Sequence, residues 1–204
     1  MRTQVSLIAL LALLLLGCKS NNKETPETET AIEAVPEIET VVYDAQGRNQ
    51  IVIDTVDDGV MLLGHIDAAS IKKEPFAEWY ATNYEGHPMD SSLVDSIKPL
   101  LADVSIKVYM GSWCEDSQRE VPALFKILEQ ASMADNRLSL VALDHDKMTP
   151  DSLQVADAIE YVPTIILSKD GQELNRIVEY PQGSLEQDLL TILKGNPYKH
   201  TYAD

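Results

Sequence analysis

The stretch "GSWCEDSQREVP" (residues 111–122) holds Cys114, the only cysteine of the chain besides Cys18. The residues before it, "VSIKVYM" (104–110), alternate as a β-strand does, and residues 114–133 carry the apolar spacing of a helix. Cys114 is therefore predicted at the first turn of a helix, where unpaired backbone N–H groups and the helix dipole favour a thiolate. A thiolate is the form that attacks a disulfide, so redox chemistry is the first hypothesis for this stretch.

The segments after this unit continue the alternation of strands and helices. The patterns predict strands at 138–144, 164–168 and 172–180, and helices at 150–158 and 184–194. The last two strands are joined by the tight turn Lys169-Asp170-Gly171. This order predicts an α/β fold with a mixed sheet: the first strands are parallel, the final hairpin is antiparallel, and helices lie on both faces.

The segment before the unit, residues 41–103, is predicted to be an N-terminal extension of strands and helices that packs on this fold. Residues 41–64 mix β-branched runs with the turn signal Asp57-Asp58-Gly59, which predicts short strands and allows a hairpin. A later helix is predicted from Asp90 or Ser91, either of which suits an N-cap. It runs to Leu101, and Pro99 is expected to bend or tighten its last turn.

An aromatic helix is predicted between these two parts. Pro75 suits its first turn. Its aromatic residues recur at helical spacing: Phe76, Trp79, Tyr80 and Tyr84. We interpret this stripe as a face packed on the core, with a ligand groove as the alternative.

The N-terminal residues have the features of a targeting signal. Arg2 supplies positive charge, residues 5–16 form an apolar run too short to span a bilayer, and "LLGC" (15–18) resembles the bacterial lipobox. We therefore predict a lipoprotein signal peptide over 1–17 and a lipid anchor on Cys18. This would place the protein in the cell envelope or periplasm of a bacterium, attached to a membrane.

The charge of the chain restricts its partners. Residues 18–40 are rich in Glu and Thr and contain no aromatic residue, which is typical of a flexible acidic tether. The whole chain has 33 acidic against 16 basic residues, a formal net charge of −17. Such a surface repels nucleic acid and anionic lipid headgroups. Nucleic-acid binding is excluded on this ground, and membrane attachment must come from the anchor.

Several positions together resemble the thioredoxin family. Trp113-Cys114 follows an apolar strand, Pro122 lies eight residues after the cysteine, and "VPT" (162–164) matches the family's cis-proline motif. "KDGQELNRIV" (169–178) is similar to the family's last hairpin. The resemblance implies a thioredoxin-like core over residues 104–196.

The resemblance also implies roles for individual residues. Cys114 would be the nucleophile, and Trp113 would form an apolar wall beside its sulfur. A cis peptide bond before Pro163 would expose the backbone of Val162 to a substrate chain, which could add to it by strand-like hydrogen bonds. The wording of residues 111–122, with a helical segment upstream, also looks like the lipid-anchored thioredoxin-like proteins of Bacteroidetes-type envelopes.

The chain departs from the family at the second cysteine of the Cys-x-x-Cys motif, which is Ser117 here. Six residues before the active-site cysteine many family members have a buried acid, and this chain has Val108. Both losses fit a monothiol site, in which Cys114 needs an external thiol to complete exchange. Glu115 and Asp116 suit a first helical turn but disfavour a thiolate, whereas the helix N-terminus and a hydrogen bond from Ser117 favour it. The sequence leaves this balance open.

No metal and no cofactor are predicted. "DHD" (144–146) is interpreted as a solvated loop rather than a metal site. The other histidines show no ligand spacing and none is placed as a base for Cys114, so a Cys–His hydrolase has no support: His65, His87 and His200. Monothiol glutaredoxins also have Cys-x-x-Ser and can hold iron–sulfur clusters with glutathione, but Glu115-Asp116 does not match their Gly-Phe.

These observations predict an envelope-facing thiol–disulfide oxidoreductase or isomerase that forms a mixed disulfide through Cys114. Ser117 would donate a hydrogen bond to the sulfur, and the docking surface would be Trp113, Val162 and Pro163. Its partners would be protein or small-molecule thiols and disulfides of the envelope. A non-catalytic module that binds peptides or proteins beside Pro163 is the alternative, and oxidation of Cys114 to a sulfenic acid is a third possibility.

Overall fold

The structure is a computed structural model and describes residues 48–203. The predicted signal peptide (1–17), the predicted lipid anchor at Cys18, the predicted tether (18–40) and the first residues of the predicted extension lie outside this part of the chain. Within residues 48–203, no helix is both long and apolar enough to cross a bilayer.

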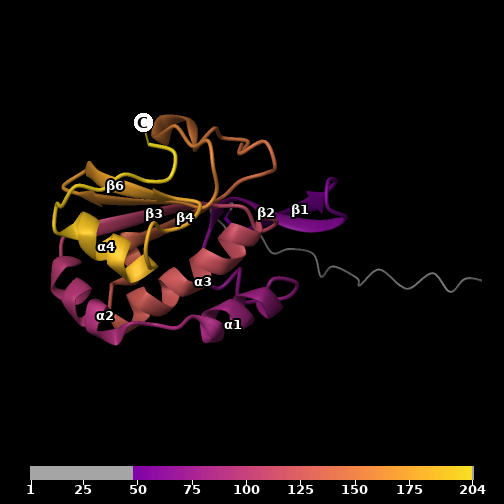
Figure 1. Ribbon diagram of the computed structural model, residues 1–204. Coiled ribbons are helices and arrows are strands. Elements are labelled where there is room, and N and C mark those ends of the chain that lie inside the picture. Colours follow the sequence, from indigo (N-terminus) through magenta and orange to yellow (C-terminus); the bar gives the residue numbers. More distant parts are fainter. Residues whose placement is uncertain (1–47, 204) are drawn as a thin grey trace, which may run out of the picture. The chain divides into compact units, whose positions relative to one another are not determined.

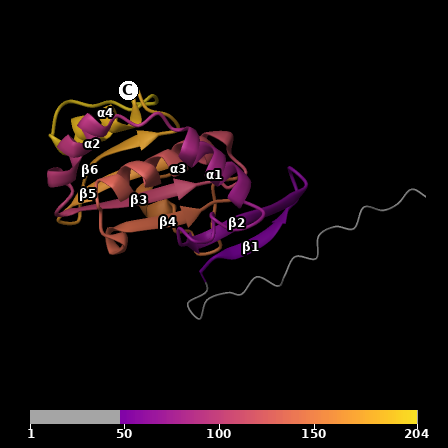
Figure 2. The same cartoon turned by 90° about the horizontal axis from the view of Figure 1, so that it is seen from below.

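The centre of the fold is one mixed sheet of six strands (Figures 1 and 2). The strands are β1 (Gln50–Asp54), β2 (Gly59–Ile66), β3 (Val104–Met110), β4 (Leu138–Ala142), β5 (Thr164–Lys169) and β6 (Gln172–Val178). They are arranged in the order β1-β2-β4-β3-β5-β6. β3 and β4 are parallel, and the other neighbouring pairs are antiparallel. The predicted mixed sheet with a parallel first pair and an antiparallel final hairpin is confirmed.

The two hairpins close at the turns that the sequence predicted. In the β1–β2 hairpin, Asp58 has a φ of 51° and Gly59 follows it. In the β5–β6 hairpin, Asp170 (φ 53°) and Gly171 (φ 76°) both take the left-handed backbone that a two-residue turn between twisted strands requires. The β1–β2 hairpin pairs through β2 with β4, so the N-terminal extension continues the central sheet.

Four α-helices pack on the sheet: α1 (Ala77–Gly86), α2 (Ser91–Ile97), α3 (Glu115–Gln130) and α4 (Leu185–Leu193). Figure 1 shows all four on the same side of the sheet. Their apolar side chains share one core cluster with alternate residues of β3, such as Ile106 and Val108. The expectation of helices on both faces is therefore only partly met, because the α-helices are all on one face.

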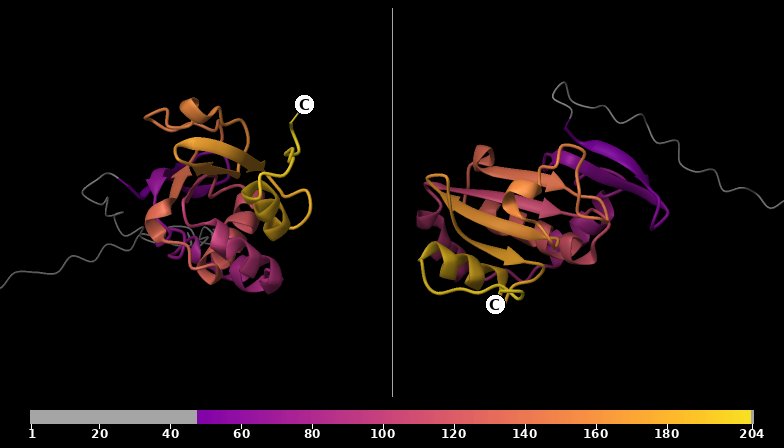
Figure 3. Two further views of the ribbon diagram at one scale, coloured as in Figure 1. Left: turned by 90° about the vertical axis from the view of Figure 1, so that its left-hand side faces the viewer. Right: turned by 90° about the horizontal axis from the view of Figure 1, so that it is seen from above.

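The opposite face is covered by residues 143–163, seen above the sheet in Figure 1 and in front of it in Figure 3 (right). This segment contains only the short 3₁₀ turn η3 (Val155–Asp157), so the helix predicted at 150–158 is wrong. Ser152 (φ 56°) and Ala158 (φ 49°) lie in the left-handed region, which interrupts a right-handed helix. The hydroxyl of Thr149 also accepts the N–H of Leu153 at 2.9 Å, a local bond that competes with the helical pattern.

The aromatic stripe of α1 faces the core, as interpreted from its spacing. Phe76 and Tyr80 are buried, and Trp79 and Tyr84 pack against the same cluster. The helix begins at Ala77, so the expectation that Pro75 forms its first turn is wrong, and Pro75 follows a cis peptide bond before the helix.

The next helix also follows its predicted boundaries closely. Asp90 caps α2, with its carboxylate accepting the N–H groups of Ser92 and Leu93, which removes two of the unpaired donors at the helix start. α2 ends at Ile97, and Pro99 lies in the tighter 3₁₀ turn η1 (Lys98–Leu100) that continues it. The predicted tightening at Pro99 is confirmed.

Candidate active site

Cys114 lies where β3 ends and α3 begins. It is the N-cap residue of α3, with an extended backbone (φ −85°, ψ 121°), and its side chain is partly exposed. The turn that leads to it is closed by a hydrogen bond from the N–H of Cys114 to the carbonyl of Gly111 (3.1 Å). Pro122 lies inside α3 and is buried. The strand, turn and helix predicted around the cysteine are all present.

The thiol of Cys114 meets the loop that opens β5. Its Sγ donates a hydrogen bond to the carbonyl oxygen of Val162 at 3.2 Å. The Val162–Pro163 peptide bond is cis, as the motif predicted. Trp113 and Cys114 both pack against the apolar cluster that contains Val162, on the face of the sheet away from the α-helices. The structure therefore brings together four of the sequence-predicted site residues.

Ser117 lies one turn into α3 and is fully buried. Its hydroxyl oxygen accepts the N–H of Gly111 at 3.1 Å, so this serine fastens the turn before Cys114. The sequence predicted a different role, donation of a hydrogen bond to the cysteine sulfur. The bond that the structure gives is to the backbone of the turn, and the donor role stays a prediction.

Trp113 is held from several sides. Its indole N–H donates to the carbonyl of Leu143 at 2.9 Å, and its ring stacks on the imidazole of His145 with centroids 4.2 Å apart. The ammonium group of Lys147 lies 5.5 Å from the centroid of the indole ring, within the range of a cation–π contact. Gly111 leaves room for this ring, because a Cβ built there would lie 2.6 Å from an indole carbon.

Ser112 is a buried residue of the turn that the sequence did not single out. Its hydroxyl accepts the N–H of Leu62 in β2 at 2.9 Å, and its carbonyl accepts the side-chain amide of Gln118 at 2.8 Å. The N-terminal extension therefore fixes the active-site turn directly. A serine next to Trp-Cys carries no sequence signal that would have predicted this partner fifty residues earlier.

His145 is the second residue that the sequence missed. Its Nε2 lies 3.0 Å from both carboxylate oxygens of Asp54 at the end of β1, and 3.8 Å from Asp57. Burial raises the pKa of Asp54, but hydrogen bonds from His145 and from the N–H groups of Val56 and Asp57 outweigh it and leave the pKa below its usual value. "DHD" is a loop, as interpreted, but its histidine faces Trp113 rather than water. β3 and β4 are parallel, so residues just after each strand share an edge of the sheet, and this rule could have placed His145 near Cys114.

The acids of the first turn of α3 are partly balanced by a cation. Arg119 pairs with Asp116 at 2.5 Å and with Glu120 at 2.8 Å. Burial raises the pKa of Glu120, and the guanidinium of Arg119 opposes this shift. The negative charge beside the cysteine is therefore shared with Arg119, a partner that the sequence pattern did not suggest.

The C-terminal residues form one border of the cis-proline loop. The ring of Tyr202 stacks on that of Tyr161, with centroids 4.0 Å apart and planes nearly parallel at 5°. Tyr161 directly precedes Val162, the acceptor of the cysteine thiol. The hydroxyl of Tyr202 is hydrogen-bonded to Glu179. The packed fold therefore extends beyond residue 196, where the predicted core ended.

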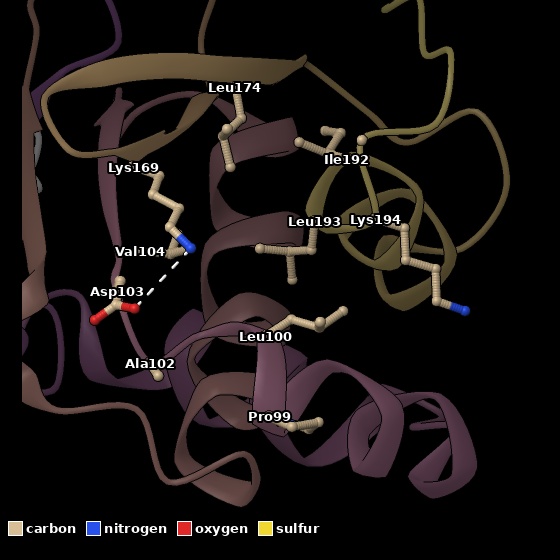
Figure 4. Close-up of a pocket in the computed structure, with 11 residues that line it drawn as sticks. Pro99, Leu100, Ala102, Asp103, Val104, Lys169, Leu174, Ile192, Leu193 and Lys194 are labelled. Atoms are coloured by element: carbon tan, nitrogen blue, oxygen red, sulfur yellow. Dashed lines mark ion pairs between the residues drawn. The ribbon is translucent and has the colours of Figure 1, made fainter.

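Of two cavities in the described part of the chain, one adjoins the turn that carries Cys114. One, of about 300 Å³, lies between the β1–β2 hairpin, the start of α1 and Trp113. The other, of about 350 Å³, is lined by Val104 at the start of β3 and by the end of α4 (Figure 4). β3 separates that second cavity from Cys114, so only the first adjoins the cysteine turn.

No protein-family model matches the sequence. No curated protein matches it either. Among solved structures, a protein of unknown function from Pseudomonas aeruginosa is 19% identical, with a TM-score of 0.49, over 65% of this chain and 93% of that one. A thioredoxin from Halobacterium salinarum is 20% identical (TM-score 0.32; 54% and 88% covered). A yeast mitochondrial 1-Cys peroxiredoxin is 23% identical (TM-score 0.33; 54% and 96% covered).

The class of the protein follows from its own architecture. A parallel β3–β4 pair, a cysteine at the N-cap of α3, a cis-proline before β5 and the final β5–β6–α4 unit define a thioredoxin-like fold. The fold is a mixed sheet flanked by helices, with an N-terminal hairpin and two helices added to it.

Proposed function

We propose that this protein is a thiol–disulfide oxidoreductase or isomerase of the bacterial cell envelope that acts through a single cysteine nucleophile, Cys114. The observation that carries the proposal is the contact between the partly exposed Cys114 sulfur and the Val162 carbonyl, directly before the cis-proline. A substrate disulfide that reaches the sulfur would lie beside Trp113, Val162 and Pro163. A lipid on Cys18 would hold the enzyme at a membrane.

The chemistry takes two exchanges. Cys114 loses its proton to solvent, and its thiolate attacks one sulfur of the substrate disulfide. A new S–S bond forms between Cys114 and that sulfur, the substrate S–S bond breaks, and the second substrate sulfur leaves as a thiolate. An incoming thiolate then attacks the substrate sulfur of the mixed disulfide and releases Cys114. When the incoming thiolate comes from the same substrate, the disulfide is isomerised; when it comes from an external thiol, the substrate is reduced.

The position of Ser117 explains why an external thiol is needed. In a Cys-x-x-Cys protein the second cysteine would break the mixed disulfide, whereas here that position holds a buried hydroxyl bonded to Gly111. The reaction at Cys114 therefore stops at the mixed disulfide until another thiol arrives.

The test is reaction of the full-length Cys18→Ala protein, in which Cys114 is the only thiol, with a chromogenic aromatic disulfide. We expect a single adduct per chain by intact mass, released by added glutathione. The Cys114→Ser protein should form none. A native protein that forms no adduct, although the same protein reacts when unfolded in urea, would rule the proposal out.

A matched pair of variants at position 117 sharpens this test. Ser117→Cys should release the bound aromatic thiol without glutathione, because the introduced thiol attacks the mixed disulfide from within the chain and leaves an internal disulfide between positions 114 and 117. Ser117→Ala should keep the adduct until glutathione is added. Equal behaviour of the two variants would contradict the assignment of position 117 as the resolving position.

A non-catalytic module that binds extended peptides or proteins beside Pro163 is the second candidate. The observation that favours it is that the thiol of Cys114 and the hydroxyl of Ser117 are both already hydrogen-bonded within the protein. The thiol donates to the carbonyl of Val162, and the hydroxyl accepts from the N–H of Gly111. The two functions differ in one cellular measurement. A Cys114→Ala protein that complements a deletion strain fully would support the binding module, and loss of complementation would support thiol chemistry.

A further inference from the structure

Three potential metal ligands converge beside Trp113 from two distant segments of the chain. Asp54 and Asp57 belong to the β1–β2 hairpin, and His145 follows β4. One donor atom from each lies within 4.8 Å of the other two. This cluster takes no part in the thiol chemistry proposed for Cys114, and the sequence pattern did not predict it.

The separations between these atoms fit a shared ion. The imidazole Nε2 of His145 is 3.0 Å from the Asp54 oxygens and 3.8 Å from an Asp57 oxygen. Zinc holds nitrogen and oxygen ligands at roughly 2.0–2.2 Å, so neighbouring ligands of a tetrahedral ion are about 3.3–3.5 Å apart. The Asp54–His145 separation is slightly shorter than this range and the Asp57–His145 separation slightly longer, so a small movement of His145 toward the exposed Asp57 would bring both into it.

The carboxylate of Asp54 is held in one orientation, whereas Asp57 is exposed on the hairpin. Oδ1 of Asp54 accepts the N–H groups of Val56 and Asp57 at 2.9 and 3.2 Å, which fixes the carboxylate in place. Oδ2 of Asp54 contacts Nε2 of His145. Asp54 is therefore a preoriented ligand. An ion bound by its Oδ2 and by Nε2 of His145 would lie to one side of the line that joins these two atoms, because 3.0 Å is too short for an ion between them.

Charge and space both favour a divalent cation here. The two carboxylates carry a charge of −2, which a divalent ion neutralises when it takes the place of the Nε2 proton that His145 donates to Asp54, and the net charge of the chain, −17, attracts cations. Asp54 and Asp57 also line the cavity of about 300 Å³ beside Trp113. A three-ligand site on a cavity leaves the fourth tetrahedral position for water or another small ligand.

We propose that Asp54, Asp57 and His145 form a binding site for a divalent transition-metal ion, best suited to zinc, on the edge of this cavity. A nitrogen ligand favours first-row transition metals over magnesium or calcium, and the three-ligand set with an open position is one that zinc adopts. An ion there would join the N-terminal hairpin to the loop that carries His145, against the ring of Trp113.

The test is calorimetric titration of the untagged full-length protein, in detergent, with zinc chloride at neutral pH. We expect one zinc per chain. Asp57→Asn and His145→Gln should each weaken binding by about tenfold or more, since removal of even indirect metal partners costs that much. Asp57 is exposed, so its variant keeps the test valid if His145→Gln does not fold.

Matched controls separate this site from adventitious binding. Asp58→Asn removes the same charge from the neighbouring residue of the hairpin and should leave the affinity unchanged, as should Cys114→Ser and Cys18→Ser. Cobalt should quench the fluorescence of Trp113, which stacks on His145, and Trp79→Phe removes the background from the other tryptophan. Absence of zinc binding, unchanged binding in Asp57→Asn, or loss of binding in Cys114→Ser would each overturn the proposal.

Discussion

The turn between β3 and α3 depends on the absence of a side chain at Gly111. The indole ring of Trp113 occupies the space where a Cβ of residue 111 would be. This same ring stacks on His145 and forms the apolar wall beside Cys114. The backbone of Gly111 in turn accepts from Cys114 and donates to Ser117. One residue therefore couples the position of the tryptophan to that of the thiol.

Gly111→Ala should accordingly displace the indole and weaken its bond to Leu143. We expect the free energy of unfolding to fall by roughly 1–3 kcal/mol, as overpacking in a core does, and adduct formation at Cys114 to slow. Urea unfolding and the rate of the mixed-disulfide reaction measure the two effects. Gly86→Ala is the control, because a Cβ at the end of α1 meets no atom within 4 Å. Equal stability of the two variants would contradict this account.

A substitution at Tyr80 should stabilise the protein, in contrast to Gly111→Ala. Its ring packs against Tyr84 and Phe125, but its buried hydroxyl is the one buried polar side-chain group in residues 48–203 that has no hydrogen-bond partner. Burial raises the pKa of Tyr80, so the hydroxyl stays neutral. Tyr80→Phe should keep the packing and raise the free energy of unfolding by about 1 kcal/mol, because a buried unpaired hydroxyl is costly. A lower stability in urea unfolding would show that the hydroxyl has a partner.

At the scale of elements, residues 143–163 replace the helix expected on the second face of the sheet. Asp157 anchors the segment: its carboxylate accepts the hydroxyl of Tyr109 at 2.6 Å and the ammonium of Lys107 at 2.8 Å. Burial raises the pKa of Asp157, but the bonds from Lys107 and Tyr109 outweigh it and lower the pKa below the ordinary 3.8. Its backbone carbonyl also accepts from Arg176 of β6.

Asp157→Asn should therefore destabilise the protein by about 1–2 kcal/mol at neutral pH, toward the lower end of the usual contribution of hydrogen bonds to a charged group, because this carboxylate is partly exposed. A carboxyl whose folded pKa is depressed contributes fully above its unfolded pKa, and this contribution is lost as the pH falls through the lower folded value. The difference between wild type and variant should be constant from pH 7 to about 5 and shrink below about 4.

Urea unfolding at a series of pH values measures this difference. Asp103→Asn is the control, because Asp103 is exposed and its pair with Lys169 is long, 4.0 Å. Such surface pairs contribute little to stability. A difference between wild type and Asp157→Asn that grew as the pH fell would contradict the assignment.

Elements with a strong local signal were predictable, and those set by distant partners were not. β3 and the β5–β6 turn follow from alternation and from Asp170-Gly171, since these patterns act between neighbours in sequence. The helix predicted at 150–158 is absent for two reasons. The local bond between Thr149 and Leu153 competes with it, and Asp157 is bound to residues of β3 and β6 that lie far away in the chain.

At the scale of the whole molecule, the net charge of −17 and the proposed lipid on Cys18 make a joint prediction. An acidic protein is repelled by an anionic bilayer surface, so the lipid alone should attach the protein to the membrane. The protein should stay with the membrane fraction in a high-salt wash, and Cys18→Ala should move it to the soluble fraction. Release by salt, or retention of the variant, would contradict the lipoprotein assignment.

The sequence by itself determined the thioredoxin-like order of strands and helices, the cysteine at the start of α3, and the cis-proline beside it. Those features depend on local periodicity and on residue types with fixed backbone demands. The sequence also predicted Trp113, Val162 and Pro163 beside the cysteine, but the tertiary structure alone decided the contacts that hold this site in place. Ser112 meets β2, Ser117 turns to Gly111, and Asp54 meets His145 across 91 residues of chain. Such contacts arise from how the sheet edge brings separate loops together, and no periodicity in the chain encodes them.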